Sequence, residues 1–294
     1  MAQMKPRYLV ATDLSDQAGF AIGRAIELAA EAEGEVVIVH IVDETLPENA
    51  QSFLTSTSDH MIRSNLSHLP LADRVAVTVD IVTGRPDVDI AERALIEDAD
   101  CIIVGLHNRL LEENRAIEGT LGEQIIRSTT KPTLLVKNKP KGPYSSVVIG
   151  VDFSAYSRAA LIAAATLAPK ADLHLIHAYQ PSLPRPIFRR LSDDETRSKL
   201  LAEDRARMEA FINAEMTALS SSGTVEEQDT SRMQCHSREG DPRDVLKKEA
   251  ERLAADLIVV GTHARIGMQR ALLGSVSTDL INDRITDVLV VRPY

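Results

Sequence analysis

The chain has 294 residues, 44% of them hydrophobic, which is enough to bury a sizeable core and favours about two domains. It carries 33 Lys and Arg against 43 Asp and Glu, a formal net charge of −10, so a nucleic acid is not the expected partner. The two cysteines, Cys101 and Cys235, have no Cys or His partner at metal-ligand spacing, so the sequence indicates neither a disulfide framework nor a zinc knuckle. No apolar run is long enough for a signal segment or a membrane span, so we expect a cytoplasmic protein.

Strands and helices alternate through the first half of the chain. An apolar strand pattern ends at Asp13, and the helix after it has apolar residues at helical spacing, with its C-cap predicted at Gly34. Further along, a Gly-x-Pro sequence at Gly84 indicates a helix start, because Pro is tolerated in the first helical turn. The predicted elements are, in order, a strand ending at Asp13, a helix, a strand over 35–43, a longer helical segment, a strand ending near Thr83, a helix from Pro86, a strand within 98–108, a helix from Gly119 and Thr120, and a strand over 132–137.

The same order of elements recurs in the second half of the chain. The offset between matched residues is 137 to 139 in the first two strands and 155 to 156 later, which places about 19 further residues in the second copy. A long helix is predicted there, after a Pro-rich loop, from the capping-box spacing of Ser192 and Glu195. The matched pairs include Asp13 with Asp152, His40 with His177, Gly84 with Gly240, Gly105 with Gly261, and Lys137 with Arg292.

A polar stretch rich in turn formers, Lys137 to Pro143, separates the two copies. We therefore predict two domains, residues 1–140 and 141–294. The regular alternation of strands and helices indicates an α/β fold in which each domain holds a mainly parallel sheet covered by helices on both faces.

Ligands of such sheets bind outside the carboxyl ends of the strands. A glycine just past a strand permits a positive φ and a close approach of the backbone, and a Gly-Ser helix start offers free N–H groups and a hydroxyl to an anion. Each feature also has a purely structural explanation as a turn or a helix cap, but their joint recurrence favours a ligand site. At this edge the second copy has Asp152, Ala178, Gly261, Gly274 and Ser275, and the first copy has Asp13, Ile41, Gly105, Gly119 and Thr120.

The universal stress protein family has a strand followed by Asp-x-Ser and, much later, a strand followed by Gly, two residues, Gly, nine residues and Gly-Ser. This chain resembles that family, in tandem over nearly its whole length. The resemblance implies an adenine nucleotide alpha hydrolase-like fold with five parallel strands per domain, and binding of ATP or another adenine nucleotide, with or without magnesium. It implies that Asp152 and the backbone of Ala178 hold the adenosine, and that Gly261 approaches the ribose and phosphates. The residues implied at the phosphates are Gly274, Ser275 and Ser277, with His263 and Ala264 in the same loop, and the first-copy equivalents of the site are Asp13, Ile41, Gly105, Gly119 and Thr120.

The two copies depart from the family pattern differently. Ala264 stands where the second glycine belongs, and Ala resists a positive φ; the first copy has Asn108 there, with one extra residue before Gly119. The loop over 106–118 has a formal charge of −1, whereas the loop over 262–273 has +2, which favours a triphosphate. The second copy is therefore predicted to hold the better preserved site, and the first to be partly degenerate.

The function predicted is adenine-nucleotide binding, chiefly through the second domain, by which the protein acts as a sensor or switch in a stress response. A protein partner is also expected, but its identity is unknown. The alternative is a nucleotide-free scaffold for protein interaction or small-lipid binding. A third hypothesis is slow ATP hydrolysis, although no general base is identified near the phosphates. His40 and His177, within apolar strands, are predicted to be structural. The family resemblance further implies that the fifth strands, around Leu134 and Leu289, pair edge to edge as an internal pseudo-dimer, with a homodimer also open.

Overall fold

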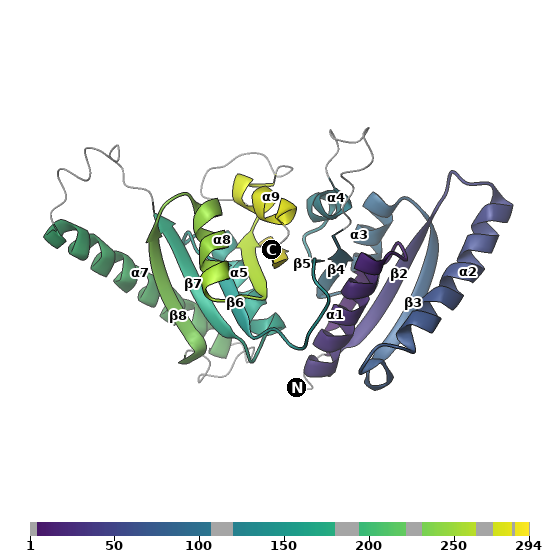
Figure 1. Ribbon diagram of the computed structural model, residues 1–294, viewed down its shortest axis with the longest axis horizontal. Helices are drawn as coiled ribbons and strands as arrows, with labels where there is room; N and C mark the ends of the chain where they lie inside the picture. Colours follow the sequence, from purple (N-terminus) through teal and green to yellow (C-terminus); the bar gives the residue numbers. More distant parts are fainter. Residues whose placement is uncertain are drawn as a thin grey trace.

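The computed structural model describes residues 5–106, 120–179, 194–221, 231–262, 273–283 and 286–293. Their strands form one ten-stranded sheet in the order β3-β2-β1-β4-β5-β10-β9-β6-β7-β8 (Figure 1). The five strands of each half are parallel to one another, which confirms the predicted α/β class. The strands are β1 Arg7–Ala11, β2 Glu35–Asp43, β3 Ala76–Gly84, β4 Cys101–Gly105, β5 Thr133–Val136, β6 Ser146–Gly150, β7 Asp172–Tyr179, β8 Met233–Glu239, β9 Leu257–Gly261 and β10 Asp287–Val291.

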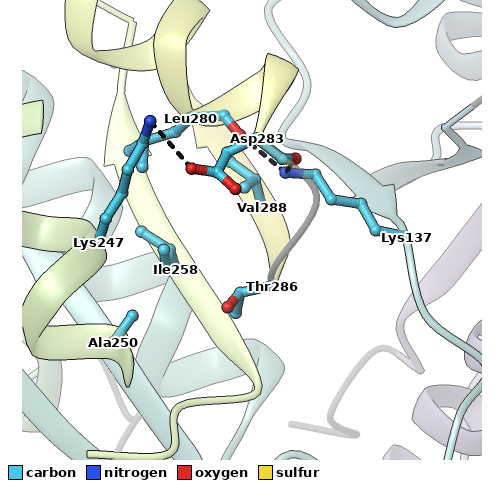
Figure 2. Close-up of a pocket in the computed structure, with 8 residues that line it drawn as sticks. All are labelled: Lys137, Lys247, Ala250, Ile258, Leu280, Asp283, Thr286 and Val288. Carbon is cyan, nitrogen blue, oxygen red and sulfur yellow. Dashed lines mark hydrogen bonds and ion pairs between the residues drawn. The ribbon is translucent and has the colours of Figure 1, made fainter. Parts of the chain in front are cut away.

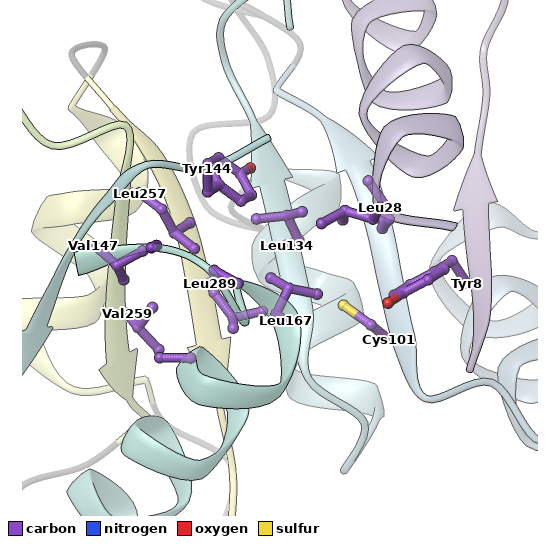
Figure 3. Packing of buried hydrophobic residues seen from close by; sticks show 14 of the residues in the cluster. Tyr8, Leu28, Cys101, Leu134, Tyr144, Val147, Leu167, Leu257, Val259 and Leu289 are labelled. Carbon is purple, nitrogen blue, oxygen red and sulfur yellow. The ribbon is translucent and has the colours of Figure 1, made fainter. Parts of the chain in front are cut away.

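The two halves meet at their fifth strands. Strands β5 and β10 pair antiparallel, with Leu134 opposite Leu289, so the predicted edge-to-edge pairing is confirmed. Figure 3 shows these two leucines beside Tyr144 in a core of buried side chains that comes from both halves. Cys101 belongs to the same core, where burial raises the pKa of its thiol to about 12.

Helices cover both faces of the sheet, as the alternation of elements predicts. One apolar cluster lies beneath α1, α2, α5 and α7, and a second lies beneath α3, α4, α8 and α9. Neighbouring residues of a strand, such as Leu9 and Val10, belong to opposite clusters, because successive side chains of a strand point to opposite faces. The helices are α1 Asp16–Ala32, α2 Glu48–Leu66, the short 3-10 helix Ala72–Arg74, α3 Pro86–Ile96, α4 Leu121–Ser128, α5 Ala155–Leu167, α7 Asp194–Ser221, α8 Pro242–Arg252 and α9 Ser275–Asn282.

The ends of the helices test the sequence predictions individually. Both Gly-x-Pro sequences open a helix with Pro in the first turn, as predicted for α3 and α8. The C-cap predicted at Gly34 is wrong by one residue, because Glu33 adopts the left-handed conformation with φ 52°. Gly34 is needed for another reason: a Cβ there would collide with the carbonyl oxygen of Pro6. No described helix combines the length and apolar character that a membrane crossing requires.

A buried polar network joins the halves next to the β5–β10 pair. The Tyr144 hydroxyl donates a hydrogen bond to Asp287 Oδ2 at 2.8 Å, and the Lys137 backbone N–H donates to Oδ1 at 2.8 Å. The guanidinium of Arg24 lies over the Tyr144 ring, 4.0 Å from its centroid, and donates to the Gly142 carbonyl oxygen at 2.8 Å. Burial raises the pKa of the Asp287 carboxyl, although these donors and Arg24 oppose the shift. The linker between the halves is therefore fixed by side chains of both.

Candidate functional site

The predicted site residues of the C-terminal half come from four neighbouring elements. Asp152 follows β6, Ala178 lies near the end of β7, Gly261 ends β9 and Gly274 is the N-cap of α9. Strand β6 lies between β9 and β7, so the three strand ends are adjacent at the carboxyl edge of the parallel half-sheet. His263, Ala264 and Gly119 lie outside the described residues, as do most of the two loops whose charges were compared.

One carboxylate oxygen of Asp152 accepts hydrogen bonds, and the other has no donor among the described residues. Its Oδ1 accepts hydrogen bonds from the Ser154 N–H at 3.0 Å and the Ser154 hydroxyl at 2.6 Å. Ser154 in turn caps α5 by accepting from the Ser157 N–H. The other oxygen, Oδ2, is buried and has no hydrogen-bond partner in the described part of the chain. Leaving such an oxygen unpaired costs about 1–3 kcal/mol, so the arrangement fits a site in which a ligand supplies the donor.

The residue after Asp152 was not singled out by the sequence reasoning. Phe153 has a left-handed backbone, φ 63°, and its ring lies 4.8 Å from the His177 ring and 5.7 Å from that of Phe211. The guanidinium of Arg207, in α7, lies 4.3 Å from its centroid. Non-glycine residues with positive φ are energetically costly and cluster at functional sites. In the sequence, the feature that could have identified Phe153 is a large apolar residue between Asp and Ser. Phe153 therefore fixes the turn that carries Asp152.

The histidines in the second strands have structural roles, as predicted. Nδ1 of His177 lies 2.8 Å from the Val151 carbonyl oxygen, and Nδ1 of His40 lies 2.8 Å from that of Thr12. Each histidine thus ties the end of the second strand to the residues that follow the first strand in its half.

The N-termini of α9 and α4 differ although they occupy equivalent places. Gly274 caps α9 without any side-chain hydrogen bond, whereas α4 starts with a capping box. In that box Thr120 Oγ1 accepts from the Glu123 N–H at 3.3 Å, and Glu123 Oε2 accepts from the Thr120 N–H at 3.2 Å. The first turn of α4 is therefore satisfied by its own side chains and carries a carboxylate. Among the described residues no side chain caps the first turn of α9, which leaves it suited to an anion.

Ser277 occupies in α9 the position that Glu123 occupies in α4. Its side chain is buried, and its hydroxyl donates to the Gly261 carbonyl oxygen at 3.0 Å. The Gly274 N–H also donates to the Thr262 carbonyl oxygen, at 2.7 Å. The hydrogen bond of Ser277 thus fixes the start of α9 against the end of β9. Ser275 is exposed, so at the start of the helix it is the Ser275 hydroxyl that faces solvent.

Gly105 and Gly261 were expected to permit a positive φ, and that expectation is wrong. Among the described glycines only Gly142 and Gly240 have positive φ. A Cβ on Gly261 would lie 2.5 Å from the Cβ of Tyr156 in α5, and a Cβ on Gly105 would collide with the backbone of α1. Packing of the first helix of each half against the end of the fourth strand is therefore sufficient to require both glycines.

The first-half residues lie at the corresponding edge of their half-sheet. Asp13 follows β1, Ile41 lies near the end of β2 and Thr120 precedes α4. Asp13 Oδ1 accepts from the Ser15 N–H at 3.0 Å and from the Ser15 hydroxyl at 2.5 Å, as in the other half, but the Asp13 side chain is exposed. The two sites therefore share their backbone arrangement and differ in burial and helix capping.

Comparison with known proteins points to one family. The sequence profile of the universal stress protein family matches residues 4–137 and 143–292. The Haemophilus influenzae universal stress protein E homolog is 31% identical over 124 residues, which are 42% of this chain and 37% of that relative's own length. The crystal structure of a universal stress protein from Archaeoglobus fulgidus, 19% identical, has a TM-score of 0.70 over 99% of this chain and all of that one. A universal stress protein in complex with cAMP, 20% identical, covers 46% of this chain and 98% of its own with a TM-score of 0.35.

Proposed function

The chain belongs to the universal stress protein family as a tandem member, and from that premise we propose that its C-terminal half binds an adenine nucleotide, ATP or AMP, as a sensor or switch in a stress response. The observation that carries the proposal is the buried Oδ2 of Asp152, unpartnered among the described residues, at the same strand edge as the start of α9, where the N-cap Gly274 makes no side-chain hydrogen bond. The first offers an acceptor to a neutral donor, and the second offers donors to an anion. A nucleotide has both kinds of group.

Each part of the nucleotide has a matching group at this edge. A ribose hydroxyl or the adenine amine donates to Asp152 Oδ2 and relieves the cost of its burial. The phosphates lie at the start of α9, where the backbone N–H groups, the Ser275 hydroxyl and the positive end of the helix dipole favour negative charge. Magnesium, where present, would be held chiefly by the phosphates of the nucleotide, as is usual for this ion.

The N-terminal half is proposed to bind no nucleotide. Its Asp13 is exposed, and the Thr120–Glu123 capping box already satisfies the first turn of α4. A phosphate there would displace a cap and approach the Glu123 carboxylate. We therefore expect one nucleotide per chain.

Isothermal titration of the full chain with ATP and magnesium tests the proposal, using Asp152→Asn and the matched first-half change Asp13→Asn. Asp152→Asn keeps an acceptor for Ser154 but replaces the unpartnered carboxylate oxygen by an amide, so ATP affinity should fall roughly tenfold or more. Asp13→Asn should bind one ATP per chain with the affinity of the unmodified protein.

Native mass spectrometry of the gently purified protein supplies the stoichiometry independently. Two nucleotides per chain, or a loss of affinity in Asp13→Asn, would contradict the assignment to the C-terminal half. Absence of binding up to millimolar ATP would contradict the nucleotide function itself and favour the scaffold alternative.

A further inference from the structure

The C-terminal end of α9 is held by a lysine from the other half of the chain. Lys137 directly follows β5, and its Nζ donates hydrogen bonds to the carbonyl oxygens of Leu280 at 2.7 Å and Asp283 at 2.5 Å (Figure 2). Carbonyl groups in the last turn of a helix lack partners within the helix, and a cation there also interacts favourably with the negative end of the helix dipole. Lys137 therefore caps, from the N-terminal half, the helix whose start is the proposed phosphate site.

A related contact at the equivalent place shows that the arrangement follows from the fold. Arg292 follows β10 as Lys137 follows β5, and its Nη1 donates to the carbonyl oxygen of Arg127, in the last turn of α4, at 3.4 Å. Because β5 and β10 are antiparallel, each fifth strand ends beside the last helix of the other half. The contact made by Lys137 is the shorter, and within the described part of the chain it involves two carbonyl groups where that of Arg292 involves one.

A second cation holds the same end of α9 from within its own half. Lys247, in α8, pairs with Asp279 Oδ2 at 2.7 Å and with Asp283 Oδ2 at 2.9 Å. Figure 2 shows Lys137 and Lys247 on opposite sides of Asp283. Helix α9 has 8 residues, about 12 Å, so a displacement of this end moves the start of the helix as well.

We propose that Lys137 is a positioning residue for the nucleotide site: through this side chain, the N-terminal half helps to set the position of the phosphate-binding start of α9 in the C-terminal half. The inference rests on the proposed function. In this arrangement the N-terminal half binds no nucleotide but influences nucleotide binding in the C-terminal half. A partner that displaces β5 or the linker after it would weaken nucleotide binding, and nucleotide binding would oppose that displacement.

If Lys137 acts through its charge, ATP affinity should depend on pH as Lys137 loses its proton. A residue that only filled space would give no such pH dependence. Burial lowers the pKa of its ammonium group to about 8, opposed by Asp283 and Asp287, with Lys247 adding to the lowering. The groups that face it are Lys247, Asp279, Asp283 and Asp287. The pKa of Lys247 is raised by its hydrogen bonds to Asp279 and Asp283, so Lys247 stays charged when Lys137 loses its proton. Between pH 7 and 9, Lys137 therefore changes charge while Lys247 keeps its own.

The experiment is titration of the full chain with ATP and magnesium at pH 7 and pH 9, on the unmodified protein and on Lys137→Met, Lys137→Arg and Lys131→Met. Lys131, which pairs with Asp98 in the N-terminal half, is the control for loss of one charge. At pH 7 we expect Lys137→Met to bind ATP roughly three- to tenfold more weakly, Lys137→Arg to retain most of the affinity, and Lys131→Met to be unchanged. Affinity of the unmodified protein should fall from pH 7 to pH 9, and that of Lys137→Met should not.

Amide hydrogen exchange without nucleotide adds a measurement that does not depend on binding: α9 should exchange faster in Lys137→Met than in the unmodified chain. Equal ATP affinities of Lys137→Met and the unmodified protein would overturn the inference while leaving the proposed function intact. Equal loss in Lys137→Arg and Lys137→Met would overturn the role of the charge. If the unmodified protein binds no ATP, the proposed function fails and the inference fails with it.

Discussion

Two aspartates with the same local sequence pattern differ because of what packs around them. Asp13 and Asp152 each form an Asp-x-Ser turn with a left-handed central residue, Leu14 or Phe153. The aromatic ring of Phe153 packs against that of Phe211 in α7, the helix in the segment where the sequence comparison placed about 19 further residues in the second copy. The pattern therefore predicted both turns, but not that Asp152 would be less exposed than Asp13, because exposure depends on how the whole chain packs and a local pattern does not record it.

The glycine at the end of β9 gives a prediction at this scale. Replacing Gly261 by Ala places a Cβ 2.5 Å from Tyr156 Cβ and 3.0 Å from its backbone, so the start of α5 must move. We expect a loss of about 1–3 kcal/mol in the free energy of unfolding, measured by urea denaturation without nucleotide. Gly19→Ala, in α1 where a Cβ meets nothing within 4 Å, is the control and should be neutral or more stable by up to about 1 kcal/mol. Equal stability of Gly261→Ala and the unmodified chain would show that this glycine is not required by packing.

Helices α4 and α9 show how one residue decides what a helix start can do. Both follow a glycine-containing sequence, and both starts were predicted to present N–H groups to phosphate. The third residue of each helix separates them: Glu123 completes a capping box in α4, and Ser277 instead contacts the end of β9. The Thr-x-x-Glu spacing is visible in the sequence and would have identified the closed start. The buried bond of Ser277 to a strand carbonyl would not have been visible, since it joins residues 16 apart through the fold.

The exposed first residue of α9 allows helix stability and phosphate binding to be separated. Ser275→Glu places a carboxylate in the first turn, where it interacts favourably with the helix dipole, by about 0.3–1 kcal/mol, but repels a bound phosphate. The variant should keep or gain stability in urea denaturation and lose ATP binding in titration calorimetry. Ser56→Glu, an exposed position in α2, controls for the added charge. Retained ATP affinity in Ser275→Glu would show that the phosphates do not lie at the start of α9.

At the scale of the whole molecule, the internal repeat predicted the pairing of the halves but not what is buried between them. Two copies of one fold with apolar fifth strands indicate a pseudo-dimer, and the β5–β10 ladder confirms it. Arg24, by contrast, is a charged residue in an amphipathic helix and would be expected to face solvent, yet its side chain is buried against Tyr144. Asp287 is likewise a buried acid at the start of an apolar strand. These charged residues are buried because the other half of the chain packs against them. The hydrophobic periodicity of one half alone therefore does not reveal their burial.

This buried network predicts a pH-dependent coupling of the two halves. Arg24 Nε lies 3.8 Å from Asp287 Oδ2, and Arg24→Met leaves that carboxylate buried without its cation, which should lower the free energy of unfolding at pH 7 by about 3–5 kcal/mol. Burial raises the pKa of Asp287 in the folded state, with Arg24 opposing the shift, so loss of Arg24 raises it further. Glu27, which also pairs with Arg24 and whose pKa burial likewise raises, changes in the same direction.

A carboxyl whose pKa is higher in the folded state takes up its proton in that state first, so lowering the pH relieves the cost of burying its charge. In urea denaturation from pH 7 down toward pH 4, the deficit of Arg24→Met relative to the unmodified chain should therefore shrink. Arg24→Met with Asp287→Asn should recover part of the lost stability at pH 7 and show a weaker dependence on pH, because only Glu27 then remains to titrate against the missing cation. A deficit of constant size across this range would mean that Arg24 stabilises the junction by its contact with the Tyr144 ring and not by pairing with the two carboxylates.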